Sequence, residues 1–176
     1  MTGSQWFDRT FELGLPADAL PNILARLESA PLRLAERVSG VIEDDLVRRV
    51  DNRWSIQEQV GHLADLEPLW LGRFDDFAAG GDTLRAADLE NRATWDAGHN
   101  QEALGDLVVR FRSLRGKLVD RVRAMSDEEL RVTAAHPRLN QPMTVADLAF
   151  FIAEHDDHHL DAIADAVAAL SEAKGR

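Results

Sequence analysis

Apolar residues recur every three or four positions along most of the chain, which is the spacing of one face of an α-helix. This spacing predicts four long helices, over about residues 17–39, 55–79, 100–125 and 144–170. Runs of β-branched and aromatic residues in strand-like alternation are rare. We therefore expect an all-α protein, and four amphipathic helices in one domain pack most economically as a four-helix bundle.

The second and fourth helices begin with recognisable cap sequences. Ser55 can accept a hydrogen bond from the amide of Glu58, and the Glu58 side chain can reach back to the Ser55 amide. Gly80 and Gly81 end this helix. The fourth helix begins at Thr144, whose cap is flanked by apolar residues that can pack across it.

Several interruptions separate these helices. Pro31 lies inside the first periodic segment, where it should kink or break the helix because proline lacks the amide N–H and its ring crowds the preceding turn. The link over residues 80–98 is long enough for a crossover and has a weak helical pattern at 84–91. A second cap sequence predicts a short helix over 126–130, and proline and asparagine mark a loop over 131–143.

Histidines supply the candidate chemistry. His155 and His159 are four residues apart on the last helix, so they lie within roughly 40° of one another on its apolar face. His158 lies at the border of the charged face. His62, on the apolar edge of the second helix, can supply a third nitrogen from across the bundle. A metalloprotease-like interpretation with Asp156 as general base is weaker, because the shorter Asp replaces the Glu of that motif.

Three inward-facing imidazoles can hold one divalent ion and leave a fourth position open for water or substrate, which is the arrangement of catalytic sites. Any one buried histidine alone is more simply explained by hydrogen bonds to neighbouring groups. His99 and His136 fall in connectors and receive no role. Glu58 and Asp65 are the candidate carboxylates near the ion, although a helix cap and a solvated face explain them more simply.

Composition narrows the function further. The chain has 176 residues, no cysteine, and 20 basic against 31 acidic side chains, a formal charge of -11. It therefore has no disulfide or thiolate metal site, and neither nucleic acid nor an anionic membrane is an expected partner. The longest apolar run, 148–153, cannot span a bilayer. No secretory signal is visible at the N-terminus, so we expect a cytoplasmic protein with one domain over 1–176 and a polar tail at 171–176.

Three segments together resemble a known family. They are W-S-I-Q-E-Q-V-G-H-L-A-D at 54–65, M-T-V-A-D-L at 143–148 and E-H-D-D-H-H-L at 154–160. A capped W-S-x-x-E with a downstream histidine, followed by a terminal H-x-x-x-H, resembles the DinB-like superfamily of damage-inducible bundle proteins.

The resemblance implies a bundle of up-down-down-up topology with a long crossover between helices 2 and 3, often as a homodimer. It also implies a divalent metal ion held by His62, His155 and His159. Relatives include transferases and isomerases that use low-molecular-weight thiols. Ala162 stands where the family commonly has Gln, three residues after the last histidine.

Two functions follow as hypotheses. The first is a metal-dependent enzyme with a small-molecule substrate, in which Zn²⁺ or Ni²⁺ activates water or a low-molecular-weight thiol cosubstrate, so that the protein is a hydrolase or a thiol S-transferase. The second is a non-catalytic, metal-binding, dimeric stress protein. A homodimer is expected in both cases, also because four Trp and seven Phe can leave apolar surface outside one core.

Overall fold

The computed structural model describes residues 6–50 and 53–174, and four long helices dominate this part of the chain. The predicted all-α four-helix bundle is confirmed. The long helices are α1 (Leu20–Val38), α3 (Ile56–Ala78), α5 (Leu104–Arg123) and α6 (Val145–Lys174). Within the described ranges, every helix is too short or too polar to cross a membrane.

Short elements connect the long helices. They are the 3₁₀ turns η1 (Trp6–Asp8), η2 (Ala17–Ala19), η3 (His99–Gln101) and η4 (Glu129–Arg131), the helices α2 (Glu43–Leu46) and α4 (Arg92–Asp96), and the strands β1 (Ala134–His136) and β2 (Gln141–Met143). The strands form an antiparallel hairpin in which Ala134 faces Met143 and His136 faces Gln141. Asn140 closes the hairpin in a left-handed conformation, which asparagine tolerates better than most residues.

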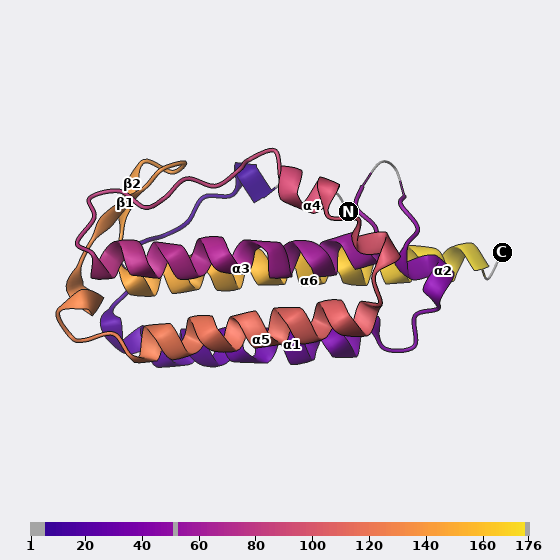
Figure 1. The fold of residues 1–176 in the computed structure, drawn as a ribbon, viewed down its shortest axis with the longest axis horizontal. Coiled ribbons are helices and arrows are strands. Elements are labelled where there is room, and N and C mark those ends of the chain that lie inside the picture. The colour runs from indigo at the N-terminus through magenta and orange to yellow at the C-terminus, as the bar shows by residue number, and fades with distance from the viewer. Residues whose placement is uncertain (1–5, 51–52, 175–176) are drawn as a thin grey trace.

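The bundle has the predicted up-down-down-up topology (Figure 1). Helices α1 and α6 run in one direction, α3 and α5 run in the other, and a crossover along the bundle joins α3 to α5. Backbone hydrogen bonds attach the beginning of this crossover to the hairpin. The Leu84 amide donates to the Ala135 carbonyl at 3.0 Å, and the Ala135 amide donates to the Asp82 carbonyl at 2.8 Å.

Four boundary predictions were wrong. Residues 84–91 are not helical, because the start of this segment is held in extended pairing with β1, and the short helix follows at α4. Part of the expected loop over 131–143 is the β-hairpin. Helix α5 begins at Leu104, after the separate turn η3, and α6 continues to Lys174, so the expected polar tail includes a last helical turn.

Of the two predicted effects of Pro31, a kink or a break, the break does not occur, because helix α1 continues through this residue. Proline lacks the amide that would bond the carbonyl four residues earlier, which is that of Leu27. Here Arg115 Nη1 of helix α5 donates to the Leu27 carbonyl at 3.2 Å. A buried side chain from a neighbouring helix therefore replaces the missing backbone donor.

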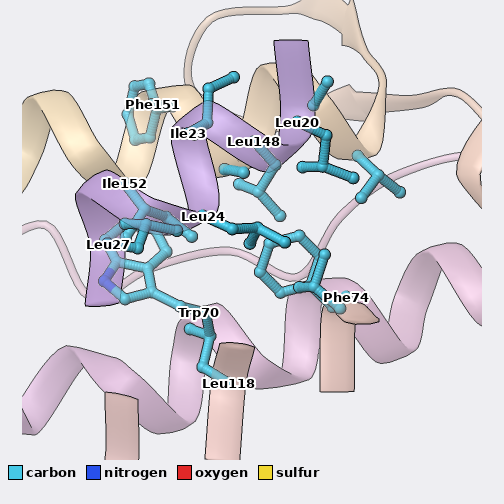
Figure 2. Packing of buried hydrophobic residues seen from close by; sticks show 14 of the residues in the cluster. Leu20, Ile23, Leu24, Leu27, Trp70, Phe74, Leu118, Leu148, Phe151 and Ile152 are labelled. Carbon is cyan, nitrogen blue, oxygen red and sulfur yellow. The ribbon is translucent and has the colours of Figure 1, made fainter. Parts of the chain in front are cut away.

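The apolar core consists of two clusters that lie toward opposite ends of the bundle. Figure 2 shows the cluster nearer the hairpin, with side chains from all four long helices; its labelled members are Leu20, Ile23, Leu24, Leu27, Trp70, Phe74, Leu118, Leu148, Phe151 and Ile152. On each long helix, the residues of one cluster are followed by those of the other. The positions between them on α3, α5 and α6 carry buried charged and imidazole groups, which form a polar layer across the middle of the bundle.

Arg115 is the centre of this layer. Its guanidinium contacts Glu67 Oε1 at 2.6 Å and Asp156 Oδ1 at 3.0 Å, and all three residues are about 1% exposed. Burial raises the pKa of Glu67 to about 7, although the charge of Arg115 opposes this shift, and burial also raises the pKa of Asp156. Asp156 therefore belongs to an internal ion cluster, which excludes the metalloprotease-like role considered for it.

Candidate metal centre

His62 of α3 and His155 and His159 of α6 come together inside the bundle. One nitrogen from each ring can be chosen so that all three lie within 4.8 Å of one another, and the Nε2 atoms of His155 and His159 are 3.1 Å apart. All three rings are buried. The i, i+4 spacing on α6 stacks two rings one turn apart, and α3 runs antiparallel beside them and supplies the third.

Hydrogen bonds orient two of the three rings. His159 Nδ1 lies 2.5 Å from Gln59 Oε1, an acceptor, so this nitrogen carries the proton. His62 Nδ1 lies 3.0 Å from Thr94 Oγ1, and that hydroxyl donates its own proton to Asp65 Oδ2 at 2.9 Å. The hydroxyl must therefore accept from His62 Nδ1–H. Both rings consequently present an unprotonated Nε2.

His155 has a different environment. Its Nδ1 is buried without a hydrogen-bond partner, and its Nε2 faces the Nε2 of His159. Burial lowers the pKa of His62 to about 4, and burial together with the neighbouring rings holds the pKa of His155 and His159 well below the ordinary value. Three neutral imidazoles with nitrogens this close together fit a divalent ion well.

Asp65 acts on the triad through Thr94 and does not join it. The same carboxylate oxygen contacts His99 Nε2 at 2.8 Å, and His99 Nδ1 lies 3.0 Å from Glu102 Oε1. His99, which received no role from the sequence, is thus buried in the network behind His62. Gly61 marks this contact, because a β-carbon there would lie 2.3 Å from the His99 ring. A glycine inside a strongly helical segment was the one signal in the sequence that another group packs closely against this helix.

Glu58 lies away from the triad. It forms the predicted cap with Ser55, accepting from the Ser55 amide at 2.9 Å, and pairs with Arg49. Although burial opposes the shift, the bonds from Arg49 and Ser55 lower the pKa of Glu58. His158 also stays outside the triad, half-buried with its ring 5.8 Å from that of Trp6.

A pocket of about 1180 Å³ opens onto the three histidines. All four tryptophans of the chain line it, namely Trp6, Trp54, Trp70 and Trp95. The ring of Trp54 lies 4.5 Å from that of His62, and those of Trp6 and Trp70 lie 5.0 and 5.7 Å from that of His155. The triad therefore forms the floor of a pocket with aromatic walls. Among the described residues, no carboxylate or further histidine joins the three rings as a potential ligand.

Comparisons with solved structures find the same fold in proteins of low sequence identity. YfiT from Bacillus subtilis, described as a probable metal-dependent hydrolase with an unusual four-helix bundle topology, has a TM-score of 0.79 and 18% identity, over 93% of this chain and 94% of YfiT. A mycothiol-dependent maleylpyruvate isomerase has a TM-score of 0.65 and 12% identity, over 83% of this chain. This chain spans 60% of the isomerase. No curated protein sequence matches the present chain.

The sequence itself identifies the family. The profile of the DinB superfamily matches residues 26–163, a stretch that includes all three histidines of the triad. The match covers most of the chain and agrees with the fold of its structural neighbours. The chain therefore belongs to the DinB superfamily.

Proposed function

We propose that this protein is a metal-dependent enzyme in which His62, His155 and His159 hold Zn²⁺ or Ni²⁺. The observation that carries the proposal is the convergence of three neutral imidazoles at the floor of a large pocket, without a carboxylate or a fourth histidine beside them among the described residues. A structural zinc site is normally closed by four protein ligands, whereas a catalytic site keeps one position for water or substrate.

The reaction classes that we propose are thiol S-transfer and hydrolysis of a small molecule. A bound ion supplies a nucleophile near neutral pH, because it lowers the pKa of a coordinated water or low-molecular-weight thiol. The thiol must come from outside, since the chain has no cysteine. The descriptions of YfiT as a probable metal-dependent hydrolase and of the isomerase as mycothiol-dependent are in keeping with these two classes.

The residues of the chain have separate tasks in this proposal. Gln59 and Thr94 fix the proton of His159 and His62 on Nδ1, so that Nε2 is free for the ion. Asp65 holds the Thr94 hydroxyl in the required orientation. The aromatic walls exclude water from one side of the site and provide a surface for an apolar part of the substrate.

Metal analysis of protein purified without a nickel column tests the site. We expect about one divalent ion per chain, and we expect His155→Ala to abolish binding because two imidazoles hold an ion far more weakly than three. His158→Ala is the matched control on the same helix, and it should bind normally. Stoichiometric binding by His155→Ala, or an equal loss in His158→Ala, would contradict the ligand assignment.

Spectroscopy of the Co²⁺-substituted protein separates the reaction classes. For a thiol transferase, a low-molecular-weight thiol should add a sulfur-to-metal charge-transfer band. For a hydrolase, the spectrum should instead change with pH near 7, where a coordinated water would ionise, and addition of the thiol should leave it unchanged. No response to either, together with a fourth protein ligand in the metal-bound state, would favour the non-catalytic, metal-binding stress protein.

A further inference from the structure

Two arginines in the wall of the pocket form no ion pair with a carboxylate within the described ranges. Arg73 of α3 is 1% exposed, and Arg138 follows β1 in the hairpin turn. Most other partly buried arginines of this acidic chain are paired, as Arg26 is with Asp157 and Arg110 with Glu102. Arg73 Nε donates to the Arg85 carbonyl at 3.0 Å, and Asp76, which pairs with Arg85, attracts Arg73 without forming a direct ion pair with it. Two arginines beside one cavity that form no direct ion pair are therefore exceptional within the described part of the chain.

His136 lies between the two arginines, but it cannot accept a hydrogen bond from every donor around it. Its Nε2 is 3.0 Å from Arg73 Nη1, and its Nδ1 faces the backbone amides of Arg138 and Leu139 at 3.3 and 3.2 Å. All of these neighbours are hydrogen-bond donors. Burial and the two nearby arginines lower the pKa of His136 to about 3, so the ring is neutral and offers only one acceptor. One ring N–H therefore points at another donor.

Arg138 adds to this excess of donors. Its Nη2 is buried and has no hydrogen-bond partner, and its Nη1 reaches only the Phe7 carbonyl, at 3.5 Å. Burial lowers the pKa of Arg138, and it lowers that of Arg73 to about 10, so both guanidinium groups stay charged at neutral pH. This side of the pocket has a surplus of positive charge and of donors and a shortage of acceptors. A bound anion would offset the positive charge and accept hydrogen bonds from the unpaired donors.

We propose that Arg73 and Arg138 form a subsite for the carboxylate of a small substrate with an apolar body. The apolar body is argued from the walls, since Arg73 Cζ lies 5.1 Å from the Trp70 ring centre and Arg138 Cζ lies 5.9 Å from that of Phe151. Phe151 stands one helical turn before His155 on α6. The carboxylate and the reacting atom at the triad would thus be separated by roughly one or two turns, about 5–10 Å.

Capture of the carboxylate requires only the arginines, whereas its orientation toward the triad rests on the proposed metal site. The test therefore uses the full-length protein after removal of metal by a chelator. Cyclohexanecarboxylate is compared with its neutral amide, which has nearly the same shape, and binding is followed by tryptophan fluorescence because all four tryptophans line the pocket. We expect saturable binding of the carboxylate and at least tenfold weaker binding of the amide.

The variants identify the cation. Arg138→Met should remove the preference for the carboxylate, and Arg112→Met, at an exposed position of α5 outside the pocket, should retain it. Arg73→Lys keeps a charge but loses the planar fork, so it should weaken carboxylate binding and spare the amide. His155→Ala should retain the preference, which separates this site from the metal site.

Three results would overturn the proposal. The first is equal binding of carboxylate and amide by the unmodified protein, or no binding of either. The second is an undiminished preference in Arg138→Met. The third is a preference that appears only after metal is added, which would place the carboxylate on the ion.

Discussion

Replacement of Arg115 by Met should destabilise the protein more than any surface charge change. The guanidinium is fully buried and pairs with two buried carboxylates, Glu67 and Asp156. Removal of one partner from a buried ion pair costs about 3–5 kcal/mol. The Leu27 carbonyl, which lacks a backbone donor because of Pro31, would also lose its bond from Arg115, at a further cost of about 1–3 kcal/mol.

The expected loss is therefore about 4–8 kcal/mol, a large part of the roughly 5–15 kcal/mol that stabilises a typical domain. Urea unfolding at pH 7 measures it, with an expected fall in the midpoint of about 2 M or more. Arg121→Met on the same helix is the matched control. Arg121 pairs with Asp75 at 2.9 Å, but Asp75 is exposed, so this change should cost less than about 1 kcal/mol.

At acidic pH, Arg115→Met should lose less stability than at neutral pH. Without the guanidinium, burial raises the pKa of Glu67 and Asp156 still further above the unfolded values of 4.5 and 3.8. A carboxyl with a raised folded-state pKa lowers stability as pH rises above its unfolded pKa. The difference between variant and unmodified protein should thus be smallest near pH 4 and largest near pH 7.

A second variant keeps this test informative if Arg115→Met does not fold. Combining it with Glu67→Gln and Asp156→Asn removes all three charges, and we expect much of the stability to return. A loss no larger than that of Arg121→Met, or a loss that does not change with pH, would refute the argument that Arg115 stabilises the two buried carboxylates.

Three further outcomes are expected. Thr94→Val should weaken metal binding about 10–100-fold by releasing the His62 ring, whereas Thr94→Ser should not; equal affinities in equilibrium dialysis would contradict the orienting role. In the metal-free folded protein, the pKa of His136 is about 3, whereas in the unfolded chain it is near 6.5. The stability of the fold should therefore fall as pH falls between these two values, by up to tenfold in the folding equilibrium per pH unit. His136→Asn should show a weaker loss of stability with acid in urea titrations. Light scattering should show a homodimer of the 19.6 kDa chain, and a monomer at micromolar concentration would contradict this.

The helices and the pairing of His155 with His159 could be predicted because both depend on local rules. A period of 3.6 residues decides which side chains share a helix face, and a cap needs only four neighbouring residues, as at Ser55 and Glu58. The sequence thus determined the bundle and the composition of the candidate triad. The absence of cysteine likewise excluded a thiolate ligand or nucleophile supplied by the chain itself.

Only the tertiary structure decided what surrounds the triad. Thr94, His99, His136 and Arg138 lie in connectors, where no periodicity indicates which way a side chain faces. Their positions depend on long-range contacts, such as the pairing of Thr83 with Ala135.

The same reason explains why the helix does not break at Pro31. Proline breaks a helix when its lost hydrogen bond is not replaced, and the replacement comes from Arg115, 84 positions further along the chain. Helix propensity is a property of neighbouring residues, whereas the satisfaction of a buried carbonyl depends on whichever group the fold brings to it. The sequence determined the four long helices and their inward faces, and packing of distant segments decided the hairpin, the arginine pair and the pocket that they line.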